Sequence, residues 1–344
     1  MKRSFVQLHI AVFLAGFTGI LGKLITLNEG LLVWYRLLIT AVTLWVIEIS
    51  AKYFRWGRPV KAAGRFEAVA ESFEIAGELG LVGPAEPVEA VRLFMPTGQA
   101  EGSGRLDRKD LLRIAGIGGI AALHWVCFYG SIKYSNVSVG LVCLSSIGFF
   151  TALLEPILLG HRHDPVELLL GLLVIAGIVC IFSFDPHYKT GILIGMLSTL
   201  LGSIFPILNK RMLERVSAST LTLYELSGGF ICLSLLMPLY LYFFPTRYLF
   251  PNAGDWGWLL ILSWICTVLA FRLSMNALRH VSAFTVNLSY NMEPVYGIFM
   301  AFVVYREDRY LNGGFYAGFA CVILAIGLQM GRLWYLHKKR PVTG

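Results

Sequence analysis

Ten runs of about 20 apolar residues, separated by short polar segments, dominate the pattern along this chain. A run of that length crosses the ~30 Å hydrocarbon core of a bilayer as one α-helix. The pattern predicts membrane-spanning helices over residues 5–27, 31–53, 111–133, 137–160, 165–184, 189–209, 218–243, 256–279, 283–304 and 312–334. A large soluble helical core would not need ten such runs, so we expect an all-α membrane protein.

The first five runs resemble the last five in order, so the first half of the chain (residues 1–186) matches the second half (residues 187–344). At one constant offset, Val137-Ser138 falls on Val281-Ser282, Leu144-Ser145 on Leu288-Ser289, and Arg162-x-Asp164 on Arg306-x-Asp308. An odd number of spans per repeat places the second copy upside down in the membrane. We therefore expect ten transmembrane helices arranged as two inverted five-helix repeats, the plan of many secondary transporters.

Lys and Arg residues are concentrated on one side of the expected membrane. If the N-terminus is cytoplasmic, the cytoplasmic segments hold the ten cations from Lys52 to Arg113 and the basic tail that begins at Arg332. The opposite side holds a smaller set: Lys23, Lys133, Lys189, Arg247, Arg306 and Arg309. This asymmetry predicts a multi-pass protein of the cell (inner) membrane with both termini in the cytoplasm. The net charge of +8 is thus an orientation signal and gives little support to nucleic-acid binding.

One segment, residues 54–110, does not fit this scheme, because it is polar and contains Gly and Pro at both ends. Within it, residues 61–80 have the apolar spacing of a short amphipathic helix. We expect spans 1 and 2 within residues 1–53, a cytoplasmic insertion at 54–110, spans 3–5 within 111–186, and the second repeat with a basic tail at 187–344. The first span is expected to be a retained helix, because its apolar run exceeds the ~7–15 residues typical of a signal peptide.

The sequence carries no signature of a metal site, a cofactor site or a catalytic centre. Its six cysteines stand singly inside the apolar runs, without a Cys-x-x-Cys pair, at positions 127, 143, 180, 232, 266 and 321. There is also no Walker loop, His-Glu-x-x-His or Gly-x-Ser-x-Gly motif. We therefore expect no catalytic residue, no cofactor and no metal, and the missing nucleotide loop argues against an ATP-driven pump on this chain.

Ionisable side chains inside the apolar runs are the best candidates for a binding site, since a charge at a helix centre costs about 3 kcal/mol. Glu293 lies about ten residues into its run, and Asn287, Tyr290 and Asn291 fall on the same side of a helical wheel. Arg272 lies seven residues from the end of the preceding run, or ~10 Å of helix. We expect these residues to form a substrate site, in which Arg272 is either a counter-ion for Glu293 or a binding group for an anionic substrate. The alternative is a hydrogen-bonded cluster that joins helices.

Glu155 and His124 are further candidates for substrate binding or coupling. Glu155 precedes Pro156 but lies about five residues from the inner end of its run, so extension to the membrane interface is the alternative. His124 lies at mid-depth and could titrate near neutral pH, and a structural, hydrogen-bonded histidine is the alternative. Arg36 and Glu225 lie near the starts of their runs, and we expect both to anchor at the interface.

Several motifs combine small residues with Pro, Lys and Glu at characteristic positions. They are Gly16-x-x-Gly19-x-x-x-Lys23, Gly202-Ser203-x-x-Pro206-x-x-Asn209-Lys210, Arg36 early in the second run, Pro294 with Glu307 thirteen residues later, and Gly318. In these features the chain resembles the EamA-type members of the drug/metabolite transporter superfamily. The first half departs from that pattern, because His163 stands where the counterpart of Glu307 would be expected. The resemblance implies a ten-helix exporter or exchanger of small metabolites that works without ATP.

Three functions follow from these observations. The leading one is a secondary transporter, an exporter or exchanger of a small polar metabolite or drug-like molecule, with Glu293 as the hypothetical proton-coupling group. An intramembrane enzyme that uses Glu293, His124 or Glu155 remains open, as does a non-transporting scaffold or receptor that docks partners through the insertion. The expected partners are a small-molecule substrate and the lipid bilayer but no nucleic acid, and a homodimer is compatible with the sequence.

Overall fold

The computed structural model describes residues 2–56, 106–160, 162–184, 186–271, 273–274 and 289–339. The chain divides into two compact units, one made of Met1–Thr40 with Gly102–Gly344 and the other of Ala41–Glu101. The described part of the second unit is the later portion of helix α2, residues 41–56. Most of the expected insertion at 54–110, including the expected amphipathic helix at 61–80, lies outside the described residues.

The described residues form helices and connecting segments, and no β-strand is found among them. The first half contributes α1 (Lys2–Leu24), α2 (Glu29–Trp56), α5 (Arg108–Tyr134), α6 (Val137–Leu144), α7 (Ile147–Leu159) and α8 (Pro165–Phe184). After the 3₁₀ turn η1 (Pro186–Tyr188), the second half contributes α9 (Lys189–Leu213), α10 (Ala218–Phe243), α11 (Ala253–Leu260), η2 (Ile261–Leu269), α14 (Glu293–Tyr305), the 3₁₀ turn η3 (Glu307–Arg309) and α15 (Gly313–Lys339).

The helices have the lengths and composition of a membrane protein. Within the described ranges, seven helices are long and apolar enough to cross a membrane. Shorter apolar helices lie at Pro165–Ile181, Ala253–Leu269 and Glu293–Tyr305. Each of the ten expected runs thus contains a helix, and the chain is an all-helical, multi-pass membrane protein.

The span predicted over 137–160 is confirmed as one candidate membrane crossing, Val137–Leu159, with a turn at Ser145 and Ser146 between α6 and α7. The Ser145 hydroxyl donates to the carbonyl of Leu141 at 3.1 Å, and the Ser146 hydroxyl donates to the carbonyl of Cys143 at 2.7 Å. Hydroxyls that bond back to the preceding turn compete with the main-chain ladder and bend helices.

A second break lies in the run expected at 283–304. Residues 289–290 are helical, a turn follows at Asn291 and Met292, and α14 begins at Glu293. Pro294 stands in the first turn of α14, where its missing N–H removes no helical hydrogen bond. The prediction of one continuous helix from Tyr290 to Glu293 is therefore wrong. Broken helices in the middle of a membrane run expose main-chain groups, and in transporters such breaks occur where a cavity is lined.

The helix that follows α11 is also irregular. η2 is a nine-residue π-helix, in which the Thr267 hydroxyl donates to the carbonyl of Leu262, five residues back, at 2.8 Å. π-Helical turns are wider than α-helical turns and are frequent at functional sites.

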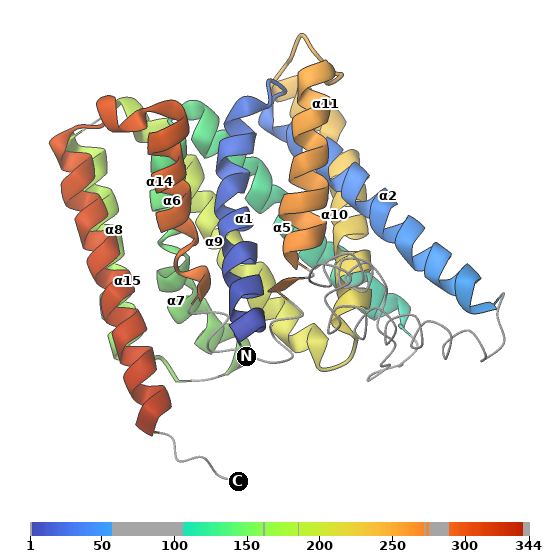
Figure 1. Cartoon of the computed structure of the whole chain (residues 1–344), viewed down its shortest axis with the longest axis horizontal. Helices are drawn as coiled ribbons and strands as arrows, with labels where there is room; N and C mark the ends of the chain where they lie inside the picture. Colours follow the sequence, from blue (N-terminus) through green and yellow to red (C-terminus); the bar gives the residue numbers. More distant parts are fainter. Residues whose placement is uncertain are drawn as a thin grey trace, which may run out of the picture. The chain divides into compact units, whose positions relative to one another are not determined.

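Helices from the two halves cross at glycines. α5 packs against α10, α8 against α15, and α1 against α14 (Figure 1). A Cβ on Gly118 of α5 would lie 2.0 Å from the carbonyl oxygen of Glu225 in α10, and a Cβ on Gly229 would lie 2.6 Å from the carbonyl oxygen of Gly118. Gly177 and Gly318 make the same arrangement between α8 and α15. Small residues let helix backbones approach closely, which stabilises helix pairs inside lipid.

We predict that Gly118→Ala destabilises the protein by about 1–3 kcal/mol, the usual cost of overpacking, because the new methyl group must displace the main chain of α10. Gly327→Ala in α15 is the matched control, since a Cβ at Gly327 meets no atom within 4 Å. Thermal unfolding of the purified variants in detergent tests this. Equal unfolding temperatures for Gly118→Ala and Gly327→Ala would contradict the crossing described here.

Candidate functional site

Arg36 is a cation held inside the first unit, with only 4% of its surface exposed. Its Nη1 donates to the Tyr129 hydroxyl of α5 at 2.8 Å, and its Nε donates to Oγ1 of Thr267 in η2 at 3.1 Å. The guanidinium also lies over the ring of Trp125, 4.1 Å from the ring centroid, an arrangement in which the ring face attracts the positive charge. The expectation that Arg36 anchors at the membrane interface is therefore wrong.

Glu293, at the start of α14, carries the other ionisable side chain considered for this site. The positive charge of Arg36 acts on the Glu293 carboxyl group, but no ion pair within 4 Å joins the two residues in the described part of the chain. A Cβ on Gly16 of α1 would lie 2.9 Å from the carbonyl oxygen of Glu293, so the main chains of α1 and α14 approach closely at this point. Opposite charges inside a bundle stabilise one another where water is excluded.

The remaining residues of the expected cluster divide into three groups. Arg272 and Asn287 lie outside the described residues. Asn291 is half-buried in the turn before α14. Tyr290 is half-buried and packs against Leu8 and Val12 of α1. Tyr290 therefore lies against α1, just before the turn at Asn291 and the start of α14 at Glu293.

His124 is buried and joins the two halves of the chain. Its Nδ1 lies 2.7 Å from the carbonyl oxygen of Ser198 in α9, so the short contact requires the proton to be on Nδ1. The Ser198 hydroxyl donates to the carbonyl of His124 at 2.9 Å. A Cβ on Gly202 would lie 2.8 Å from the imidazole ring, so α9 packs directly on it. His124 is therefore in a structural, hydrogen-bonded setting between α5 and α9.

Glu155 forms an ion pair at one end of the unit. Lys210, in the last turn of α9, donates to its Oε1 at 2.8 Å. The Lys210 side chain is 64% exposed, and the Glu155 side chain is 32% exposed. We call this end of the first unit the Lys210 end. A shallow cavity of about 340 Å³ lies there, lined by Leu158, Leu159, Lys210, Arg211 and Glu214.

Glu307 forms a more enclosed ion pair, with Lys23 in the last turn of α1. Lys23 Nζ donates to Glu307 Oε1 at 2.8 Å, and the Glu307 side chain is 4% exposed. The carboxylate also accepts from the main-chain N–H of Val137 at 3.1 Å and of Ser138 at 2.9 Å, and from the Ser138 hydroxyl at 2.7 Å. Glu307 therefore ties α1 and the segment after α14 to the start of α6. We call this end the Lys23 end.

Further contacts close the Lys23 end. The buried carboxylate of Asp255, at the start of α11, accepts from the N–H and the hydroxyl of Thr26, each at 2.7 Å. Lys133 of α5 donates to the carbonyls of Ile25 and Leu27. The loop after α1 is thus attached to α5 and α11, whereas the ion pair between Lys210 and Glu155 is more exposed.

Glu225, expected at the interface, is instead buried with 8% of its surface exposed. The side-chain amide of Asn209 in α9 donates to both of its carboxylate oxygens, at 3.1 and 3.0 Å. The expectation that Glu225 anchors at the interface is therefore wrong. Like Arg36, Glu225 has polar partners within the helix bundle.

Two residues of this site were not predicted from the sequence. Arg36 is seven residues beyond the start of α2 at Glu29, or ~10 Å of helix. Arg272 was chosen as a candidate because it lies the same number of residues from the end of its run. The same criterion could have identified Arg36 as a site residue. Glu307 was visible only as part of a family motif, because its partners are 169 or more residues away in the sequence.

We predict that Glu307→Gln opens the Lys23 end. Hydrogen bonds to a charged group contribute about 1.5–3 kcal/mol, so losing the charge should raise the reaction rate of a cysteine reporter at the buried Val137 position about tenfold or more. The measurement compares labelling of Val137→Cys by a charged thiol reagent with and without Glu307→Gln. Glu214→Gln at the Lys210 end is the control. Unchanged labelling would contradict a closing role for Glu307.

Comparisons with known proteins agree with this architecture. The model of the EamA-like transporter family matches residues 90–183 and 189–330. The chain is 22% identical over 308 residues to the uncharacterized transporter YetK of Bacillus subtilis (strain 168). The aligned region covers 82% of this chain and 89% of that protein. A solved crystal structure has a similar fold, with a TM-score of 0.51 and 14% identity over 94% of this chain and 95% of the other. The chain belongs to the EamA-like transporter family.

Proposed function

We propose that this protein is a secondary transporter that moves a small polar molecule by alternating access between its two ends. Its family and its curated relative point to a membrane transporter rather than an enzyme. The observation that carries the proposal is the buried Arg36, which donates hydrogen bonds to residues of both halves of the chain, together with the partly buried Glu293 at the break before α14. Transporter sites are commonly built where repeats meet, from helices that break near the membrane midplane.

The helix contacts support an inverted repeat. If α1 corresponds to α9, and α6 with α7 to α14, then the packing of α1 on α14 has its counterpart in the packing of α9 on α6 and α7. If α5 corresponds to α11 with η2, the packing of α1 on η2 has its counterpart in that of α9 on α5. The family model also matches the chain twice, once in each half.

The two ends differ in a way that fits one state of an alternating-access cycle. The Lys23 end is closed by the buried Glu307 carboxylate, while the Lys210 end has a more exposed ion pair and a cavity. In the proposed cycle the Lys23–Glu307 pair separates when the other end closes. The site between Arg36 and Glu293 then faces alternate sides of the membrane.

The proposed topology places ten membrane-spanning helices between cytoplasmic termini in the cell (inner) membrane. α1 begins and α15 ends at the same end of the first unit, as an even number of crossings requires (Figure 1). In this arrangement the segment at 54–110 is a cytoplasmic insertion in the first repeat, and the Lys210 end is also cytoplasmic.

The experiment has two stages. Purified protein is first screened for thermal stabilisation by amino acids, sugars, nucleosides and cationic drugs, since a ligand that binds the folded state raises its stability by RT ln(1 + [L]/Kd). Each stabilising compound is then tested for uptake into proteoliposomes. Arg36→Lys should abolish both responses, because lysine keeps the charge but lacks the planar donors that bond Tyr129 and Thr267.

We predict that Glu293→Gln abolishes uptake driven by a pH gradient while preserving exchange of the same compound across the membrane. Glutamine keeps the shape of the side chain but cannot take up and release a proton. The measurement is tracer uptake with and without a pH gradient, with Glu214→Gln as the control for a carboxylate at the surface. Wild-type pH dependence in Glu293→Gln would rule out this carboxylate as the coupling group.

A further inference from the structure

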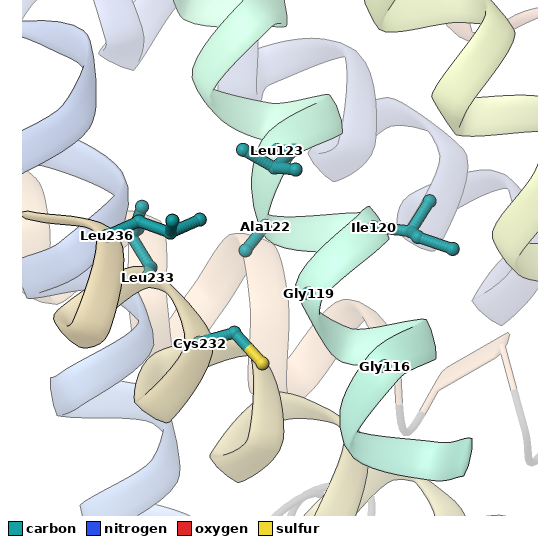
Figure 2. Close-up of a pocket in the computed structure, with 8 residues that line it drawn as sticks. All are labelled: Gly116, Gly119, Ile120, Ala122, Leu123, Cys232, Leu233 and Leu236. Atoms are coloured by element: carbon teal, nitrogen blue, oxygen red, sulfur yellow. The ribbon is translucent and has the colours of Figure 1, made fainter. Parts of the chain in front are cut away.

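An apolar groove runs between α5 and α10 on the surface of the first unit. Figure 2 shows Cys232 and Leu236 of α10 opposite Gly116 and Gly119 of α5. The groove has a volume of about 260 Å³ and is lined by Gly, Ala, Leu, Ile and Cys residues alone. It is smaller than the ~300–1,000 Å³ usual for a drug-sized ligand and offers no side chain to orient a polar one.

The groove exists because two glycines lie beside a close helix crossing. A Cβ on Gly116 would meet no atom within 4 Å, so the position is open, and a Cβ on Gly119 would lie 3.3 Å from Cys232 Sγ. Leu123 and Leu236, at the rim, are 38% and 42% exposed. In a membrane-spanning chain this surface contacts the hydrocarbon of the bilayer.

Arg113 precedes the groove by one turn of α5, and Arg215 shares a carboxylate with it. Arg113 lies on the same face of α5 as Gly116, Ile120 and Leu123, because these positions follow helical spacing. The Asp110 carboxylate lies 3.2 Å from Arg113 Nη1 and 3.7 Å from Nη1 of Arg215, so it gathers both guanidinium groups. These arginine side chains are 59% and 58% exposed, and two cations against one carboxylate leave a net charge of +1.

The distance from the two arginines to the far end of the apolar groove matches the depth of one lipid leaflet. The ten residues from Arg113 to Leu123 rise ~15 Å along the helix, about half of a ~30 Å hydrocarbon core and hence one leaflet. Guanidinium groups pair with phosphate through two parallel hydrogen bonds. We propose that the groove binds one acyl chain of an anionic phospholipid whose phosphate is held by Arg113 and Arg215.

This site requires only that the chain spans a membrane, and it is independent of the substrate and of the transport cycle. A general orientation role for the basic residues makes a different prediction. An orientation role requires positive charge near the membrane surface, but it does not require a fixed number of bound lipids. It also does not depend on the shape of the groove.

The test uses the full chain in a zwitterionic detergent, with phosphatidylglycerol or phosphatidylcholine added. Native mass spectrometry should show one retained phosphatidylglycerol, and thermal unfolding should show stabilisation by that lipid but not by phosphatidylcholine or inorganic phosphate. Gly116→Leu, which fills the groove, should lower the affinity for phosphatidylglycerol about tenfold. The double variant Arg113→Gln with Arg215→Gln should remove the preference for the anionic lipid.

Matched controls separate this site from general effects. Gly327→Leu places the same side chain at another open glycine, and Arg247→Gln removes a cation from an exposed position near the Lys23 end; both should bind the lipid as the unmodified chain does. Leu236→Asn, at the exposed rim, tests the groove again if Gly116→Leu does not fold. Equal binding of both lipids, equal stabilisation by inorganic phosphate, unchanged binding in the groove variants, or a dimer that Gly116→Leu dissociates would overturn the proposal.

Discussion

A charge inside an apolar helix bundle is stable only when hydrogen bonds and an opposite charge replace the water it has lost. Arg36 finds polar and aromatic partners in both halves of the chain: Tyr129 and Trp125 of α5, and Thr267 of η2. Because these partners belong to different helices, the arginine fixes how those helices approach. Any movement between the two halves must change the surroundings of Arg36. Arg36 therefore stabilises the fold and is also placed to respond to the movement in the proposed cycle.

The rest of the unit combines close packing with points where the helices are interrupted. Glycine crossings at Gly118–Gly229 and Gly177–Gly318 hold pairs of helices with their main chains in contact. By contrast, the breaks after α6 and before α14 interrupt the runs that adjoin the buried cluster. The Lys23–Glu307 pair connects the end of α1 to the start of α6, so it controls one end of the same helices. Rigid pairs joined by such breaks provide a physical basis for the proposed movement.

The apolar runs predicted the helices well, because a length of about 20 apolar residues is a local property of the sequence. The breaks were not predicted. Ser145 and Ser146 interrupt a run through hydroxyl bonds to the preceding turn, and serine is common enough in such helices to give no clear signal. Pro294 was visible, but its place at the start of α14 depends on the turn before it.

The candidate site was predicted only in part, because side-chain partners depend on tertiary contacts. Glu293 and Tyr290 were identified by depth, whereas Arg36 was assigned to the interface. Its partner Thr267 is 231 residues away in sequence and cannot be inferred from local spacing. Glu225 was misassigned for the same reason, since the amide that satisfies it comes from α9.

In the proposed cycle, the Lys23 end opens and closes during transport. The most direct measurement places cysteines at Lys23 and Glu307, in a chain without its six native cysteines, and joins them with a short, reducible bis-thiol reagent in proteoliposomes. Uptake of a substrate should stop when the Lys23 end is cross-linked and return when the link is reduced. Uptake that continues unchanged through the cross-linked protein would contradict the proposed cycle.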